Sequence, residues 1–237
     1  MMPRALAFDV FGTIVDWRSG VARESAGFLA RIGRSDIDAA MFADEWRARY
    51  QPAMAAVRDG QRSFVILDVL HREMLEATLA DLGVASATLD PTLLEEWTLA
   101  WHRLDPWPDV VDGLTRLKVR FPVVTLSNGN IALMLAIARR GGLPWDAILG
   151  AEVTRSYKPK PEAYLATALI LGIAPGELCL TAAHHSDLVA ARSAGLLTAY
   201  VDRPQERGGA PAPYRAQRQD WDWEASSLID LAERLGC

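Results

Sequence analysis

The fold is decided by one stretch near the N-terminus, Ala5-Leu6-Ala7-Phe8-Asp9-Val10-Phe11-Gly12-Thr13. Its first four residues form a short apolar run, which is typical of a buried strand. An acid follows the run directly, and a glycine turn follows the acid, so a carboxylate and several backbone N–H donors are expected together at a sheet edge. A small molecule can approach such an edge. Asp9 is therefore a candidate nucleophile, although an acid in this position can also cap the turn that follows it.

Short apolar runs recur along the chain, at residues 123–126, 147–149, 178–182 and 197–201. Most of them are separated by segments in which apolar residues repeat every three or four positions, at residues 131–140, 161–171 and 187–194. Strands that alternate with helices predict an α/β fold, here a Rossmann-like, doubly wound parallel sheet with crossover helices.

Residues 17–104 interrupt this alternation. Four stretches resemble amphipathic helices, at residues 21–32, 37–57, 64–82 and 91–103, and no convincing strand lies among them. The last stretch meets Asp105-Pro106-Trp107-Pro108, whose prolines end a helix and make a stiff return. We therefore expect a helical cap domain at residues 17–104, inserted into a catalytic core made of residues 1–16 and 105–237.

Length and composition limit the classes of protein to consider. The chain has 237 residues, is 50% hydrophobic and carries a net charge of -5, which gives no general attraction to nucleic acid or to anionic lipid. Its two cysteines show no disulfide or zinc spacing. The longest apolar stretch, residues 131–138, is far below the roughly 18 residues that a bilayer requires. No secretion signal is recognisable, and we expect a cytoplasmic protein that binds neither nucleic acid nor membrane.

Candidate active groups follow four separate strand-like runs: Asp9, Ser127-Asn128-Gly129, Lys158 and Asp187. In a doubly wound sheet the carboxyl ends of the strands share one edge. Groups that lie far apart in the sequence are therefore expected to meet in one crevice.

The ordered set of motifs resembles the haloacid dehalogenase superfamily. The Asp9 stretch is similar to its first motif, Thr125-Leu126-Ser127-Asn128-Gly129 to its second, Tyr157-Lys158-Pro159-Lys160-Pro161-Glu162-Ala163-Tyr164 to its third, and His184-His185-Ser186-Asp187 to its fourth. With the cap, the resemblance covers essentially the whole chain. Within the superfamily the sequence looks most like the L-2-haloacid dehalogenases. The resemblance implies that Asp9 displaces halide from C2 of a short (S)-2-haloacid, and that water hydrolyses the resulting ester to a 2-hydroxy acid, with neither metal nor other cofactor.

Two positions separate this chemistry from that of the superfamily phosphatases. Those enzymes carry a second Asp two positions after the nucleophile, which protonates a leaving alkoxide, and commonly an Asp four residues before the last acid of the fourth motif, which helps to hold Mg²⁺. These positions are Phe11 and Ala183 here. A halide leaves as a stable anion and needs no proton, so the two replacements favour carbon–halogen chemistry. Phe11 is instead counted among the residues that contact substrate.

The resemblance also assigns roles around Asp9. Lys158 is expected to hold the charge of Asp9 and to orient the substrate, although an isolated Lys-Pro-Lys-Pro segment would be solvated. Thr13 is expected to bond to Asp9 or its loop, Ser127 to bind the substrate carboxylate, and Asn128 to lie toward the halide. Ser-Asn-Gly can equally be a turn that satisfies its own backbone.

Two further residues complete the expected site. Arg47, in Glu45-Trp46-Arg47-Ala48-Arg49-Tyr50, matches the position of an Arg that binds the leaving halide, although an Arg in a charged helix is usually a surface residue. The fourth motif departs from the family, because Ala182 and His184 replace the usual Ser and Asn. Either Asp187 or His184 can serve as base toward the hydrolytic water, and His184-His185 can alternatively be a hydrogen-bonded loop pair.

Two other functions compete with the dehalogenase. One is a Mg²⁺-dependent small-molecule phosphatase of the same superfamily, and the other is a noncatalytic protein that binds small anions. The family resemblance makes a cap-mediated homodimer reasonable.

Overall fold

The computed structural model describes residues 2–209 and 220–237. Five parallel strands form one sheet in the order β2-β1-β3-β4-β5. The strands are β1 (Ala5–Phe8), β2 (Val123–Thr125), β3 (Leu178–Ala182), β4 (Leu197–Val201) and β5 (Trp223–Ala225). The chain order reverses beside β1, so Asp9 leaves the sheet at the crevice where open α/β sheets bind ligands. The predicted α/β fold with a parallel sheet is confirmed.

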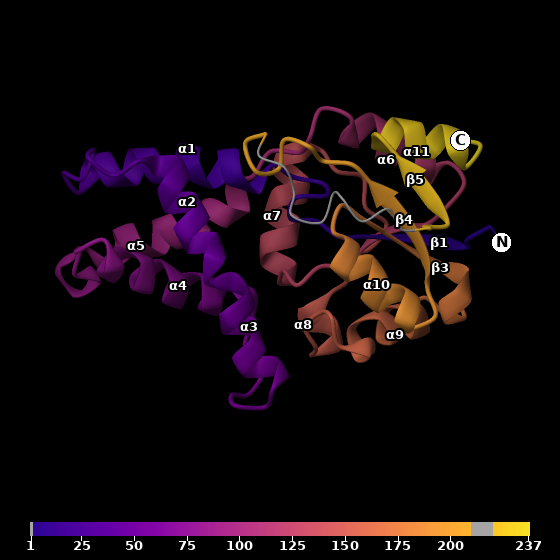
Figure 1. Ribbon diagram of the computed structural model, residues 1–237, viewed down its shortest axis with the longest axis horizontal. Helices are drawn as coiled ribbons and strands as arrows, with labels where there is room; N and C mark the ends of the chain where they lie inside the picture. Colours follow the sequence, from indigo (N-terminus) through magenta and orange to yellow (C-terminus); the bar gives the residue numbers. More distant parts are fainter. Residues whose placement is uncertain (1, 210–219) are drawn as a thin grey trace.

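Successive strand residues point to opposite sides of the sheet, and helices bury both sides. Leu6 and Phe8 pack on one side with α6 (Val110–Lys118) and α11 (Leu228–Arg234), and α7 (Ile131–Gly141) belongs to the same cluster. Ala5 and Ala7 pack on the other side with α9 (Pro161–Ile170) and α10 (His185–Ser193). Figure 1 shows the sheet between these two layers of helices. The short helix α8 (Ala151–Thr154) and the 3₁₀ turn η3 (Pro175–Glu177) complete the connections.

The segment between β1 and α6 is entirely helical or irregular. It contains α1 (Trp17–Arg31), α2 (Ala39–Ala48), α3 (Tyr50–Arg58), α4 (Leu67–Asp81) and α5 (Pro91–Thr98), with the 3₁₀ turns η1 (Ser86–Thr88) and η2 (Leu99–Arg103). These helices gather on one side of the sheet-containing part (Figure 1). We retain the division into a cap of residues 17–104 and a core as a proposal.

Three details differ from the sequence prediction. The expected helix over residues 37–57 is two helices, because Pro52 has no N–H for the carbonyl of Ala48. The expected strand at residues 147–149 is reduced to isolated bridges beside β2, where Thr125 Oγ1 donates to Leu149 O and accepts from Leu149 N. The three-residue strand β5 was not predicted, since so short a run has no readable periodicity.

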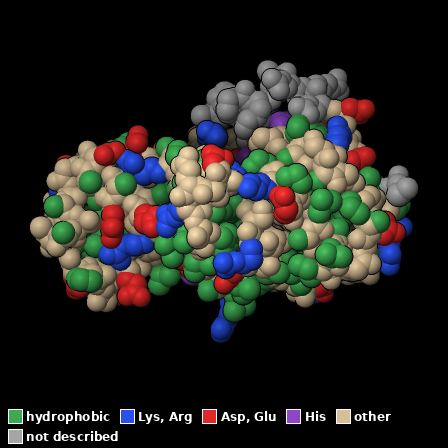
Figure 2. All heavy atoms as spheres, turned by 90° about the horizontal axis from the view of Figure 1, so that it is seen from below, with side chains coloured by type: hydrophobic (Ala, Val, Ile, Leu, Met, Phe, Trp, Pro, Cys, Tyr) green, Lys and Arg blue, Asp and Glu red, His purple; other side chains and the backbone are tan. Residues whose placement is uncertain are grey.

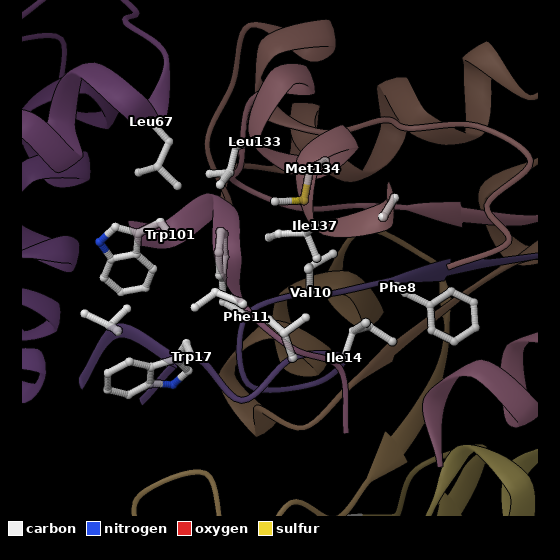
Figure 3. Packing of buried hydrophobic residues seen from close by; sticks show 14 of the residues in the cluster. Phe8, Val10, Phe11, Ile14, Trp17, Leu67, Trp101, Leu133, Met134 and Ile137 are labelled. Carbon is white, nitrogen blue, oxygen red and sulfur yellow. The ribbon is translucent and has the colours of Figure 1, made fainter. Parts of the chain in front are cut away.

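An aromatic cluster joins the β1–α1 loop to the helical segment. The ring of Phe11 lies edge-on to Trp101 at 5.8 Å and to His71 at 6.4 Å, and Trp17 stacks on Trp101 at 6.1 Å. Figure 3 shows Phe11, Trp17 and Trp101 turned toward one another, with Val10 and Ile14 beside them. Burial of these rings fixes the loop that follows Asp9 against the helical segment.

The surface carries charges of both signs. Figure 2 shows acidic and basic side chains interspersed with apolar ones across one face of the molecule. Among the described residues, no helix is long and apolar enough to cross a bilayer.

Candidate active site

A cavity of about 840 Å³ lies at the carboxyl ends of the strands and is closed on one side by α2 and α3. The structure brings seven of the nine sequence-predicted site residues to its wall. They are Asp9, Phe11, Arg47, Asn128, Lys158, His184 and Asp187. The other two, Thr13 and Ser127, are buried behind the wall. Residues separated by up to 178 positions in the chain therefore share one crevice, as expected for this sheet topology.

Asp9 is held by three side chains. Lys158 Nζ donates to its Oδ1 at 2.8 Å, Thr13 Oγ1 donates to its Oδ2 at 2.7 Å, and His184 Nδ1 lies 3.3 Å from Oδ2. Burial alone would raise the pKa of Asp9, but the charge of Lys158 and the hydrogen bond from His184 hold it well below its usual range. Asp9 is therefore an ionised carboxylate with only 8% of its surface exposed, which suits a nucleophile.

Lys158 lies between two carboxylates. Its Nζ also donates to Asp187 Oδ2 at 2.5 Å, and Tyr164 donates through its hydroxyl to the other oxygen of Asp187 at 2.6 Å. Burial would lower the pKa of Lys158, but the charges of Asp187 and Asp9 raise it above the ordinary value. At neutral pH Lys158 is thus a charged partner of the Asp9 carboxylate. Tyr164, the last residue quoted for the third motif, contacts the site through its hydroxyl.

The second-motif residues differ in how they meet the cavity. Asn128 lines it, and its Oδ1 accepts from Lys158 N at 2.9 Å. Ser127 Oγ accepts from Gly129 N at 3.1 Å, as in a turn that satisfies its own backbone. Thr13 Oγ1 accepts from Ala183 N at 2.9 Å while donating to Asp9, so it ties the first motif to the fourth. Thr13 acts on the carboxylate rather than on the space in front of it.

Arg47 reaches the cavity from α2. Its guanidinium lies 3.9 Å from the ring centroid of Tyr50 and 5.4 Å from that of Trp17, and its NH1 is buried without a hydrogen-bond partner. A buried guanidinium N–H that faces a cavity is a ready donor for an anion. Asp9 lines the same cavity, so the cavity combines a buried carboxylate with a cation.

One buried acid was missed by the sequence analysis. Glu206, in the loop after β4, places both carboxylate oxygens near His184 Nε2, at 2.9 and 3.1 Å, and accepts from Trp17 Nε1 at 3.0 Å. The available signal was its place: like Asp9, Glu206 lies shortly after an apolar run, in Asp202-Arg203-Pro204-Gln205-Glu206. That signal is weak, because a single acid in a charged loop is usually solvated.

The two positions at which the superfamily phosphatases carry an acid are buried in this structure. Phe11 is 3% exposed within the aromatic cluster, and Ala183 is also buried. Within residues 2–209 and 220–237, no group of three or more His, Cys, Asp or Glu side chains is placed to hold a metal ion. The residues around Asp9 do not fit the Mg²⁺ site of the phosphatases.

Comparison with known proteins gives the family. The haloacid dehalogenase-like hydrolases match residues 3–195. The chain belongs to this family. It is 48% identical to the defluorinating L-2-haloacid dehalogenase Rha0230, whose crystal structure superposes with a TM-score of 0.96 over 99% of this chain and 96% of the other.

Other members of the family are more distant. An (S)-2-haloacid dehalogenase from Pseudomonas sp. (strain YL) is 28% identical over 97% of this chain and 93% of its own. The L-2-haloacid dehalogenase from Xanthobacter autotrophicus, solved with chloropropionic acid covalently bound, is 25% identical with a TM-score of 0.80 over 98% of each chain. A phosphoglycolate phosphatase from Neisseria gonorrhoeae is 30% identical over 84% of this chain and 79% of its own.

Proposed function

We propose that this protein hydrolyses the carbon–halogen bond of short (S)-2-haloacids to give 2-hydroxy acids, through an ester on Asp9. The observation that carries the proposal is the environment of Asp9. Its carboxylate is buried, ionised and held by Lys158 and Thr13, while position 11 carries a phenylalanine packed among aromatic rings instead of a second acid. The Xanthobacter relative with covalently bound chloropropionic acid supports a covalent intermediate.

In the first step a carboxylate oxygen of Asp9 attacks C2 of the haloacid from the side opposite the halogen. The new carbon–oxygen bond forms as the carbon–halogen bond breaks, and the halide leaves with the electron pair. Arg47 faces the same cavity and stabilises the departing anion, and Asn128 also lines this cavity. No proton is needed by the leaving group, which is consistent with Phe11.

In the second step water attacks Cγ of the Asp9 ester. The water loses one proton to a base, the Cγ–O bond to the substrate breaks, and the departing oxygen receives a proton, so that Asp9 and a 2-hydroxy acid result. Lys158 is placed to protonate that oxygen and to recover a proton from Asp187, which it contacts. Asp187 and His184 are the two candidate bases.

Halide release tests the proposal. Purified, chelator-treated protein is incubated with racemic 2-chloropropionate and with chloro-, bromo- and fluoroacetate; the fluoro compound is included because the 48% identical relative is named as defluorinating. We expect halide release that survives chelation and disappears in Asp9→Asn. Silence across the panel, with Mg²⁺-dependent phosphate release in a parallel sample, would replace the proposal with the phosphatase. Ligand binding without turnover, unchanged in Asp9→Asn, would indicate the noncatalytic anion binder.

Two further proposals, on oligomeric state and on location, accompany this function. We propose a homodimer on the family resemblance alone. We also propose a cytoplasmic location, which agrees with the two cysteines being free in the described structure.

A further inference from the structure

His184 lies between two carboxylates at the edge of the cavity. Its Nδ1 is 3.3 Å from Asp9 Oδ2, and its Nε2 is 2.9 and 3.1 Å from the two oxygens of Glu206. A neutral imidazole has one N–H and one lone pair. One of its two nitrogens would then direct a lone pair at a carboxylate, whereas an imidazolium donates on both sides. The geometry is that of the charged ring.

The electrostatics agree with this geometry. Burial would lower the pKa of His184, but the hydrogen bonds with Asp9 and Glu206 raise it to about 10. Burial would likewise raise the pKa of Glu206, but the hydrogen bond and charge of His184 lower it. A ring that is already protonated at neutral pH cannot accept a proton from water, so His184 is unsuited to the role of base.

Glu206 is itself firmly placed. Trp17 Nε1 donates to its Oε1, and Gly12 leaves the room it occupies: a Cβ at Gly12 would stand 2.2 Å from Glu206 Oε1. Arg203, three residues earlier, anchors the loop by donating to Thr13 O at 2.9 Å and pairing with Asp109 at 2.8 Å. A loop that is fixed to the first motif in this way holds its carboxylate against His184.

The two oxygens of Asp9 are not equivalent. Oδ2 faces two donors, Thr13 Oγ1 and His184 Nδ1, while within residues 2–209 and 220–237 the side-chain donor to Oδ1 is Lys158 Nζ. The less occupied oxygen is the better nucleophile. Oδ2 then becomes the carbonyl oxygen of the ester, which carries the negative charge when water attacks Cγ. Two preorganised donors at that position form an oxyanion hole.

We propose that Glu206 is a positioning residue that keeps His184 an imidazolium, and that His184 donates to the Oδ2 oxyanion during ester hydrolysis instead of acting as the base. This inference rests on the proposed dehalogenase function. Esterification removes the charge of Asp9, so that Glu206 becomes the carboxylate that holds the proton on His184. The proton of the attacking water then passes to Asp187.

The test is the pH dependence of Glu206→Gln. The amide retains the shape of the side chain but not its charge, so the pKa of His184 falls. A group whose pKa is raised supplies its charge below that pKa and loses it above. We expect wild-type halide turnover to remain level from pH 6 to about pH 9, and turnover by Glu206→Gln to fall by about tenfold between pH 6 and pH 8.5, as a charge-assisted donor is lost.

The charged groups that face His184 set these limits. In the described part of the chain they include Asp9 and Glu206 in direct contact, Lys158 beyond Asp9, and Arg47, whose charge acts on Glu206. Glu206→Asp keeps the carboxylate and should restore the wild-type profile in part. Glu233→Gln, on the exposed side of α11, is the matched control and should leave the profile unchanged. Mass spectrometry should show the Asp9 ester accumulating in Glu206→Gln at high pH.

The competing role of His184, as the base toward water, predicts the opposite dependence of turnover on pH. If His184 were the base, Glu206→Gln would turn over faster as pH rises, and this result, or an unaltered profile, would overturn the proposal. A measurement without substrate separates this inference from the proposed function. In ¹⁵N NMR of histidine-labelled protein, assigned with His184→Asn, the His184 ring should be doubly protonated at pH 8 in the wild type, and its pKa should be lower in Glu206→Gln, where Asp9 is the one of the two carboxylates that remains. A neutral ring in the wild type would refute the inference even if halide is released.

Discussion

Replacement of Lys158 by Met removes the cation that neutralises two buried carboxylates. Lys158 Nζ lies 2.8 Å from Asp9 and 2.5 Å from Asp187, and its side chain is 8% exposed. Breaking a buried ion pair by removing one partner costs about 3–5 kcal/mol, because a charge is left without compensation. Methionine fills a similar volume, so we expect no large cavity term. The free energy of unfolding at pH 8 should therefore fall by about 3–5 kcal/mol in Lys158→Met.

The loss should depend on pH in a defined direction. In the wild type the pKa of Asp9 is held below its ordinary value, so its contribution to stability is present above the unfolded-state pKa of 3.8 and is lost as pH falls through the folded-state pKa. In Lys158→Met the charge that lowers the pKa of Asp9 most strongly is absent, so the carboxylate takes up a proton at a higher pH than in the wild type, and the penalty shrinks as it does so. The difference between wild type and variant should therefore be smaller at pH 5 than at pH 8.

Urea unfolding followed by tryptophan fluorescence at both pH values measures this difference. Lys160→Met is the matched control, because Lys160 is exposed two residues away, and it should change the free energy of unfolding by no more than about 0.5 kcal/mol. A loss below about 1 kcal/mol in Lys158→Met, equal at the two pH values, would refute the reasoning that Lys158 is the compensating charge.

Three further changes test neighbouring contacts. Thr13→Val removes the donor to Asp9 Oδ2 and leaves Ala183 N unsatisfied; we expect kcat to fall by roughly 10²-fold and stability by about 1–3 kcal/mol, measured by halide release and urea unfolding. Arg47→Lys keeps the charge but loses the planar donors over Tyr50, so kcat/KM for 2-chloropropionate should fall by at least about tenfold, and an unchanged value would remove Arg47 from the anion site. Phe11→Asp places an unpaired carboxylate among Trp101 and His71, so we expect a clear drop in Tm and no phosphatase activity; a stable variant that releases phosphate with Mg²⁺ would contradict this expectation.

The sequence predicted the sheet because its strands carry their own signal. β1, β3 and β4 are runs of four or five residues that are apolar apart from Thr181 and Thr198, and buried parallel strands must be largely apolar on both faces. β5 was not predicted because its three residues include Glu224 and pair with β4 only in the folded chain. The break between α2 and α3 was readable from Pro52, but the surrounding helical periodicity concealed it.

The site likewise contains residues with a local sequence signal and residues whose role depends on contacts in the folded chain. Asp9, Lys158 and Asp187 lie within recognisable motifs. The expected topology of the sheet predicts that these motifs meet at one edge. Glu206 belongs to no motif, and its importance comes from two contacts, with His184 and Trp17, that link it to segments 22 and 189 positions away. The charge state of His184 likewise depends on both of its neighbours in space. No local pattern contains that information.

The way β2 meets its neighbour also bears on self-association. The segment at residues 147–150 lies along the outer side of β2, and the hydroxyl of Thr125 takes part in hydrogen bonds that a regular strand would make through its backbone. The unpaired edge of a sheet is a template on which another chain can add a strand, and here that template is covered. Two copies of this protein therefore have no route to association by extending the sheet at β2. A second copy that approaches this edge meets residues 147–150 before it reaches β2, so association there depends on the surface charge and shape of that segment, which are set residue by residue.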